Sequence, residues 1–259
     1  MDEALVTLTV DDGIATVALN RPAKLNALTP AMIDALAIHA TRIDEDESIR
    51  CVLLTAAGDK AFCVGADINA WSALAPLDMW RRWTRRGHQV FDQWARLRVP
   101  VVAAINGHAL GGGLELAAVA DIRVADRRAT FGLPEAGIAT CPGWSGTQRL
   151  TRLIGTSRVK YLALTGRRMS ADDAWRDGLV QEVAEPGTTL ETARAIANDI
   201  ARQAPVSVQL TKQLIDGGAG EGLAAALEGM AGALAATTGD AAEGLNSFRQ
   251  KREPRYEGR

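Results

Sequence analysis

Residues 106–116 have the sequence NGHALGGGLEL, in which three consecutive glycines precede Glu115. Glycine lets the backbone come close to a ligand and turn its N–H groups toward it, because no Cβ stands in the way. A second acid, Glu135, follows a proline in FGLPEAG, residues 131–137. Acid–base chemistry needs two carboxylates in different surroundings, since one acts as a base while the other supplies a proton. The two segments therefore predict a catalytic site built on glycine turns.

The composition is that of an ordinary globular chain, because 47% of its 259 residues are hydrophobic and 23% are charged. That length allows a large core, so we expect one main domain with a smaller appendage. The net charge of −2 provides no basic field of the kind that attracts nucleic acid. Charge balance therefore argues against nucleic acid as a partner.

Cysteine is sparse and scattered along the chain. Cys51, Cys63 and Cys141 have no CxxC spacing, and no cysteine–histidine cluster is typical of a metal site. We expect reduced, mostly buried thiols in an intracellular protein. The acidic N-terminus, MDE, is neither a secretory signal nor a basic transit peptide, and no apolar run is long enough to span a bilayer. The sequence therefore predicts a cytoplasmic protein without a metal ion or a membrane partner.

The order of apolar segments predicts an α/β fold. Two β-rich runs at 5–10 and 14–19 flank DDG, which is a hairpin signal. Continuous apolar runs at 51–55, 99–105 and 122–125 indicate buried parallel strands with helices between them. The first of these helices begins at Pro30, with Thr29 as its N-cap.

The C-terminal part of the sequence is helical. Helical patterns cover residues 190–203, 205–215 and 221–237, and a last one begins near residue 240. A helical hairpin alone could not bury the apolar residues of this part, so it must pack on the body or on another subunit. We therefore divide the chain into a core, 1–203, and a C-terminal helical region for oligomerisation, 204–259.

Five segments carry a resemblance to a known family. They are LNRP at 19–22, LNAL at 25–28, KAFCVGADI at 60–68, PGWSGTQRL at 142–150 and FRQKR at 248–252. Together with the triple-glycine segment, and in this order, they resemble the enoyl-CoA hydratase/isomerase family, also called the crotonase superfamily. The resemblance covers nearly the whole chain.

The resemblance implies a spiral of ββα units with C-terminal helices, assembled as a homotrimer or a dimer of trimers. Members of the family bind acyl-CoA thioesters and stabilise an enolate-like intermediate. Coenzyme A would enter as part of the substrate, without a separate cofactor. The family fold alone does not fix the reaction, because the scaffold hosts hydratases, isomerases, hydrolases and lyases.

By resemblance, the catalytic residues are Glu115, Glu135, Ala66 and Gly112. The backbone N–H groups of Ala66 and Gly112 would form an oxyanion hole for the charge that builds on the thioester oxygen. Hydratases of the family have glutamate at both acidic positions, and the pair handles one water. Isomerases commonly keep only the acid that matches Glu135. This chain has both acids, which favours a hydratase.

The resemblance also implies residues that bind the substrate. Lys24 is near the position that holds the adenine, and Lys251 matches a basic position that reaches the nucleotide phosphates, often across a subunit boundary. Gly143 matches a residue whose amide helps to place the water. Ile68 and Asp67 belong to the oxyanion segment, although Asp67 is better explained as the cap of a helix that begins near Ile68. The family often has a lysine soon after this motif, whereas here Asn69 follows.

Two features are unusual for the family. Trp144 stands where a small residue is common, so its indole either narrows the acyl pocket or fills the core. Between 68 and 99, Trp80, Trp83, Gly87, Val90 and Trp94 have helical spacing, with Arg81, Arg82, Arg85 and Arg86 on the other side. The pattern favours an inward apolar face and a solvated basic face. The alternative is that an arginine meets an acidic acyl chain or a CoA phosphate.

These observations predict an enoyl-CoA hydratase that adds water reversibly, with syn stereochemistry, to a 2-enoyl-CoA. The alternatives are an enoyl-CoA isomerase, a retro-aldol or hydrolytic crotonase reaction, and a non-catalytic relative that binds acyl-CoA or RNA. The two glutamates and both oxyanion segments argue against a non-catalytic role. The net charge argues against RNA.

Overall fold

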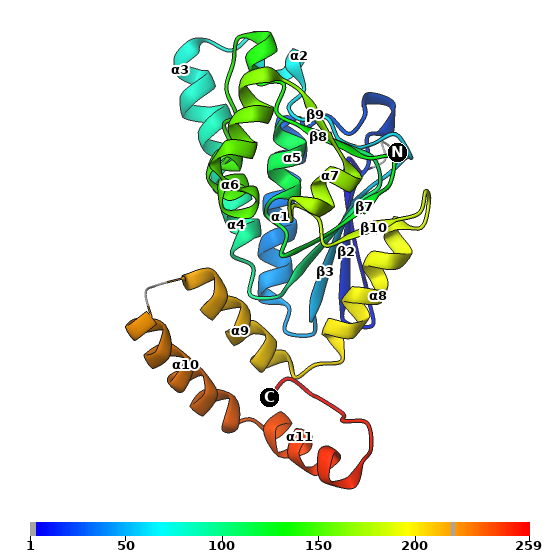
Figure 1. Ribbon diagram of the computed structural model, residues 1–259, viewed down its shortest axis with the longest axis vertical. Helices are drawn as coiled ribbons and strands as arrows, with labels where there is room; N and C mark the ends of the chain where they lie inside the picture. Colours follow the sequence, from blue (N-terminus) through cyan, green and yellow to red (C-terminus); the bar gives the residue numbers. More distant parts are fainter. Residues whose placement is uncertain (1–3, 219–220) are drawn as a thin grey trace.

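The computed structural model in Figure 1 describes residues 4–218 and 221–259, with the backbone alone for 221–226. The acidic N-terminal residues 1–3, on which the expectation about a targeting segment rests, lie outside the described residues. The larger sheet has the strand order β1-β2-β3-β5-β7-β10. Its strands are β1 Val6–Asp11, β2 Ile14–Leu19, β3 Cys51–Ala56, β5 Val101–Ile105, β7 Ile122–Asp126 and β10 Glu182–Ala184. Only β1 runs antiparallel to its neighbour, β2.

A second, smaller sheet has the order β4-β6-β8-β9. Its strands are β4 Ala61–Cys63, β6 His108–Leu110, β8 Thr130–Gly132 and β9 Arg168–Ser170. β4, β6 and β8 are parallel, and β9 is antiparallel to β8. The glycine segment and FGLPEAG thus place their first residues on adjacent strands, β6 and β8. This pairing brings the two acidic segments of the sequence side by side.

The helices begin where the sequence provides caps. Thr29 Oγ1 accepts a hydrogen bond from Met32 N at 3.3 Å, and Ser170 Oγ accepts one from Asp173 N at 3.1 Å. The helices are α1 Pro30–Glu45, α2 Ile68–Trp71, α3 Pro76–Asp78, α4 Arg85–Ala95, α5 Gly112–Ala117, α6 Gly146–Thr165, α7 Ala171–Arg176, α8 Thr189–Ala201, α9 Pro205–Gly217, α10 Glu221–Ala236 and α11 Gly239–Gln250. Short turns of helix cover Pro22–Lys24, Met79–Thr84 and Glu135–Ile138.

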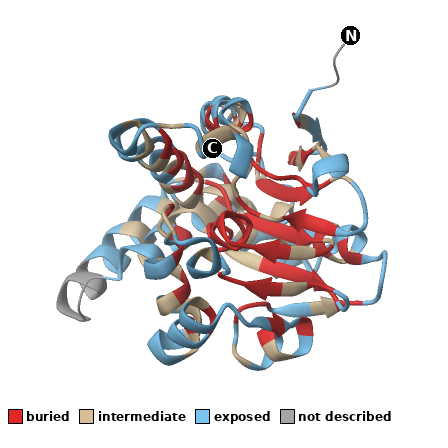
Figure 2. Cartoon of the chain, turned by 90° about the horizontal axis from the view of Figure 1, so that it is seen from above, coloured by how far each residue is buried: buried red, intermediate tan, exposed pale blue. Residues whose placement is uncertain are grey.

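The larger sheet is buried on both faces, as the continuous apolar runs predict. In β3, Val52 and Leu54 belong to the main core, whereas Cys51 and Leu53 belong to a second cluster on the other face. Helix α8 packs on β3, β5 and β7 and covers that second cluster. Figure 2 shows the buried residues concentrated on the strands. The predicted α/β class is confirmed, and the prediction of mostly buried cysteines holds for Cys51 and Cys63 but not for the exposed Cys141.

The segment before α4 departs from the predicted single helix. Trp83, Gly87, Val90 and Trp94 are buried, but Trp80 is 63% exposed. The reason is a π-helical turn at Met79–Thr84, which has more residues per turn than an α-helix and so shifts the register of the preceding residues. The inward position predicted for Trp80 is therefore wrong. The basic face is exposed, as predicted, at Arg81, Arg82, Arg85 and Arg86.

The last three helices extend away from the two sheets (Figure 1). An ion pair anchors α9 to the core, where Lys212 Nζ lies 2.5 Å from Asp121 Oδ1. The C-terminal tail returns to the core, where Arg50 Nη2 donates to the carbonyl of Tyr256 at 2.7 Å. Among the described residues, no helix combines the length and the apolar character that crossing a bilayer requires.

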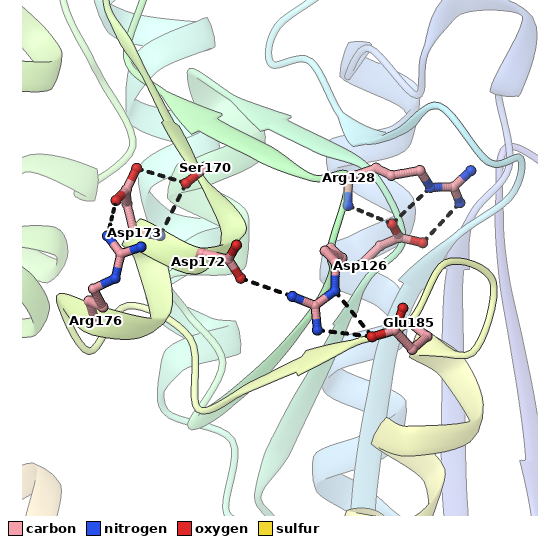
Figure 3. Close-up of polar contacts among 8 residues, drawn as sticks. Asp126, Arg128, Ser170, Asp172, Asp173, Arg176 and Glu185 are labelled. Atoms are coloured by element: carbon pink, nitrogen blue, oxygen red, sulfur yellow. Dashed lines mark hydrogen bonds and ion pairs between the residues drawn. The ribbon is translucent and has the colours of Figure 1, made fainter.

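A polar network holds the turn after β7 against α7 and β10 (Figure 3). Arg127 donates to Glu185 at 2.9 Å and to Asp172 at 3.2 Å, while Arg128 pairs with Asp126 at 3.0 Å. Because these groups satisfy one another and none of them contacts Glu115 or Glu135, the network is structural.

Candidate functional site

Two backbone N–H groups lie side by side at the start of α5. Gly65 has φ +98°, and a Cβ there would lie 3.0 Å from the carbonyl oxygen of Leu110 and 3.1 Å from Gly112 N. Only glycine accepts this dihedral and this approach without strain. A Cβ on Gly112 would in turn lie 3.6 Å from Ala66 N. Within the described part of the chain, neither the Ala66 nor the Gly112 N–H donates a hydrogen bond, so both are free for a ligand.

Glu115 lies one turn further along α5 and is 2% exposed. Its Oε1 accepts hydrogen bonds from Trp144 N at 2.9 Å and from Gly146 N at 2.8 Å. A Cβ on Gly146 would collide with the Glu115 side chain, so only glycine fits there. Burial raises the pKa of Glu115, while the backbone N–H groups of the 143–146 loop act in the opposite direction. The loop thus holds one oxygen of a buried carboxyl in a fixed place.

Glu135 opens the short turn after Pro134, and its carboxylate lies over the glycine triplet. A Cβ on Gly111 would be 2.9 Å from Glu135 Oε1. Its Oε2 is buried and has no hydrogen-bond partner among the described residues. Burial, with a smaller contribution from the Glu115 charge, raises the pKa of Glu135 to about 7. A buried acid with an unused oxygen and a neutral pKa is suited to proton transfer.

The raised pKa of Glu135 makes stability depend on pH. The ordinary pKa of a glutamate is 4.5. Between this pH and about pH 7, the unfolded chain therefore releases a proton from Glu135 that the folded protein keeps. The stability contribution of this group is therefore complete below pH 4.5 and is lost as the pH rises to about 7. Glutamine cannot ionise, so Glu135→Gln removes this loss. The unfolding free energy of the variant should rise by about 1–2 kcal/mol relative to wild type between about pH 5 and about pH 8, a value reduced because Glu135 is partly exposed to solvent.

Urea unfolding of both proteins at the two pH values measures this difference. Glu191→Gln, which changes an exposed glutamate on α8, is the matched control and should show no such trend. A Glu135→Gln difference that stays constant with pH would mean that Glu135 titrates normally in the folded protein.

Trp144 lies against the paired N–H groups. Its indole is 3% exposed and packs between α5 and α4: a Cβ on Gly112 would be 2.6 Å from its Cζ3, and one on Gly87 would collide with its Nε1. The ring centroids of Trp83 and Phe91 are 5.3 Å and 5.1 Å away, in tilted and edge-on arrangements typical of aromatic packing. The indole thus forms part of the core and borders the candidate oxyanion hole.

The loop that carries Trp144 is held by polar contacts that the sequence did not reveal. Ser145 has φ +70°, and its Oγ lies 2.9 Å from His88 Nδ1. Asp92 contacts His88 at 3.2 Å and also pairs with Arg149. His88 and Asp92 on α4 are more than fifty residues before Ser145 and Arg149, so no local pattern in the sequence links the two pairs. The role of Gly146 could have been found, because a glycine after PGWS marks a close approach.

The remaining predicted residues lie elsewhere. The carboxylate of Asp67 caps α2 through Asn69 N at 3.0 Å and pairs with Arg21 at 2.7 Å, which confirms it as a helix cap. Ile68 is 50% exposed, and Lys24 is exposed near Asp67. Lys251 follows the last residue of α11, and α11 lies far from α5 in Figure 1. The structure therefore brings together Ala66, Gly112, Glu115, Glu135, Gly143 and Trp144, and does not bring Lys251 to them.

Two other polar residues, His108 and Cys63, also lie in this region. His108 Nδ1 lies 2.9 Å from Thr130 Oγ1 on the neighbouring strand. Burial raises the pKa of the Cys63 thiol to about 12, so it stays protonated. Among the described residues, no group of three or more histidines, cysteines or acids is placed to hold a metal ion.

The geometry provides two free donors beside the buried carboxyl group of Glu115 and the half-buried one of Glu135. Such donors stabilise an oxyanion, and the acids can move protons on either side of it. The arrangement suits a substrate whose carbonyl gains negative charge during the reaction.

Comparison with known proteins places this site in a family. The family model described as enoyl-CoA hydratase/isomerase matches residues 9–259. A short-chain-enoyl-CoA hydratase of Clostridium acetobutylicum is 40% identical over 96% of this chain and 95% of its own, and an (E)-benzylidenesuccinyl-CoA hydratase of Thauera aromatica is 37% identical over 98% and 99%. The crystal structure of an enoyl-CoA hydratase from Bacillus anthracis superimposes with a TM-score of 0.95 at 38% identity, covering 98% of this chain and 100% of that one. The chain belongs to the enoyl-CoA hydratase/isomerase, or crotonase, family.

Proposed function

We propose that the protein is an enoyl-CoA hydratase, a hydro-lyase that adds water reversibly to a 2-enoyl-CoA with syn stereochemistry. The observation that carries the proposal is the pair of glutamates beside the two free N–H groups of Ala66 and Gly112. The relatives named as hydratases, at 37–40% identity over nearly the whole chain, support it.

The geometry suggests how the groups divide the reaction. The thioester oxygen accepts hydrogen bonds from Ala66 and Gly112, which receive the charge that forms when water adds at the β-carbon. Glu115, held by the N–H groups of the 143–146 loop, takes the proton from that water. Glu135, whose pKa is raised to about 7, gives its proton to the α-carbon. One O–H bond of water, the O–H bond of Glu135 and the C=C π bond are broken, while the C–O bond, the C–H bond and an O–H bond on Glu115 form; return of the proton from Glu115 to Glu135 restores the enzyme, so one whole water is added.

The arrangement of Glu115 favours hydration over isomerisation. Moving a double bond needs only one acid that takes a proton and returns it. Here, however, two backbone N–H groups fix Oε1 of a second buried acid beside the first. A group held so firmly in the site suits a water-activating role.

A screen of acyl-CoA thioesters with products identified by mass tests the function. A hydratase yields a product heavier by one water from crotonyl-CoA or a related 2-enoyl-CoA. An unchanged mass with a moved double bond would identify an isomerase, and release of free CoA would identify a hydrolase. No conversion of any thioester would contradict an enzymatic role.

Binding of the CoA part and assembly belong to the same proposal. Lys24 would meet the adenine, and Lys251, remote from Glu115 in one chain, would reach the phosphates of a neighbouring subunit. We propose a homotrimer or a dimer of trimers in the cytoplasm, built through residues 204–259. The exposed apolar side chains on α9–α11 support this assembly, among them Ile215 at 74%, Met230 at 69% and Phe248 at 85%.

Ending the chain before Pro205 should therefore cause aggregation or loss of assembly. The truncation removes the helices that would contact other subunits, together with the Lys212–Asp121 anchor. Light scattering after gel filtration measures the outcome. Full-length Lys212→Met is the control, since it loses the anchor but keeps the helices. A soluble, active, monomeric truncation product would refute the assembly.

A further inference from the structure

A groove of about 390 Å³ runs along the outer side of the Met79–Thr84 turn and α4. Its lining residues come from two successive turns: Trp80, Thr84, Arg85, His88 and Gln89. The π-helical turn that moves Trp80 out of the core is what places its ring, 63% exposed, on this groove. The feature that differs from a regular helix thus builds one wall of the groove.

The groove adjoins the loop that holds the catalytic glutamate. A Cβ on Gly143 would lie 3.3 Å from the methyl group of Thr84, and Ser145 contacts His88. The same loop donates to Glu115 through its backbone. On the other side of the loop, the indole of Trp144 fills the space between α4 and α5. Thr84, which lines the groove, therefore packs directly on the loop that holds Glu115.

Arg85, the arginine that lines the groove, differs from its neighbours in having no carboxylate partner within the described part of the chain. Arg82 pairs with Asp78 at 3.2 Å, and Arg86 pairs with Asp34 at 2.9 Å. Arg81 lies over the Trp80 ring, 6.0 Å from its centroid. Arg85 has no carboxylate partner among the described residues, and it is the one arginine that lines the groove. An unpaired guanidinium beside an aromatic ring suits a ligand that has both a hydrocarbon part and a carboxylate.

We propose that this groove binds the far end of a dicarboxylic acyl chain, with the chain along Trp80 and its terminal carboxylate on Arg85. The inference rests on the proposed acyl-CoA function and names a substrate class for the same site. His88 is already engaged by Asp92, so Arg85 supplies the free positive charge.

Calorimetry with the full-length protein tests the groove without depending on turnover. The probes are saturated thioesters matched in length: hexanedioyl-CoA against hexanoyl-CoA, and octanedioyl-CoA against octanoyl-CoA. At least one diacid should bind about tenfold more tightly than its partner, as expected for a charge-assisted hydrogen bond. Arg85→Gln should abolish this preference and leave the affinity for the monoacid within about twofold. Arg82→Gln, which changes an arginine outside the groove, should keep it.

Equal binding within both pairs would overturn the groove proposal, as would an Arg85→Gln variant that retains the preference or weakens all four thioesters alike. The proposed hydratase reaction is tested by a separate measurement, the hydration of crotonyl-CoA. Hydration of crotonyl-CoA without a diacid preference refutes the groove alone, and a diacid preference without hydration refutes the hydratase alone. If none of the four thioesters binds, the groove proposal fails, and hydration of crotonyl-CoA still decides the proposed reaction on its own.

Discussion

Replacing Glu115 or Glu135 with glutamine should lower the hydration rate of a 2-enoyl-CoA by about 10²–10⁴-fold, the usual contribution of a positioned acid or base. Glutamine keeps the size of the side chain and can still accept the N–H groups of Trp144 and Gly146, so the fold should persist. It cannot exchange a proton near neutral pH. Turnover of the best substrate, followed by loss of the conjugated thioester absorbance, measures the effect.

The two variants should also change how stability depends on pH. Each should gain stability on wild type as the pH rises, because burial raises the pKa of both carboxyl groups, that of Glu135 to about 7. Glu191→Gln controls for the loss of one negative charge and should keep wild-type activity. A folded Glu115→Gln or Glu135→Gln protein with turnover within tenfold of wild type would remove that residue from the proposed mechanism.

Trp144→Ala should change both stability and the preferred acyl chain. Its indole is buried against Trp83 and Phe91, so alanine should cost about 3–5 kcal/mol of unfolding free energy. The indole also borders Gly112, next to the thioester oxygen in the proposed mechanism. Wild type should therefore prefer short or flat acyl groups to long saturated ones, and the variant should shift kcat/KM toward bulkier enoyl-CoAs.

Phe91→Ala is the matched control for this variant. It removes a fully buried ring from the same aromatic group, with a comparable loss of stability. Because the ring packs on the indole, its removal should leave the acyl profile largely unchanged. Thermal unfolding and a chain-length series of enoyl-CoAs provide the two measurements. A large stability loss in Trp144→Ala with an unchanged profile would show that the indole only fills the core.

The sequence predicted those parts of the fold that depend on local patterns. The hairpin at Asp11–Gly13, the cap at Thr29 and the apolar strand at 51–55 follow from turn chemistry and hydrophobic periodicity, and all are found. The adjacency of Gly65 and Gly112 could be expected by resemblance alone, because the contact joins segments far apart in the chain.

The errors and omissions have physical causes. Trp80 was misplaced because helical spacing assumes a constant number of residues per turn, which a π-helical turn violates. The contacts of Ser145 with His88, and of Arg149 with Asp92, have no sequence signature, since they join α4 to the start of α6 across the tertiary fold. The raised pKa of Glu135 depends on how deeply the fold buries it, which no spacing reveals.

The fit of Trp144 between two glycines also restricts how such a site can arise. A side chain at residue 87 and an indole at residue 144 would occupy the same space. A tryptophan can therefore enter this loop only in a chain that has already lost any larger residue from that point of α4, so the order of the two substitutions is fixed. The same epistasis applies to engineering: the indole must be transplanted into a relative together with its glycine. Once the indole is in place, a larger residue cannot return at position 87, because it would collide with the ring.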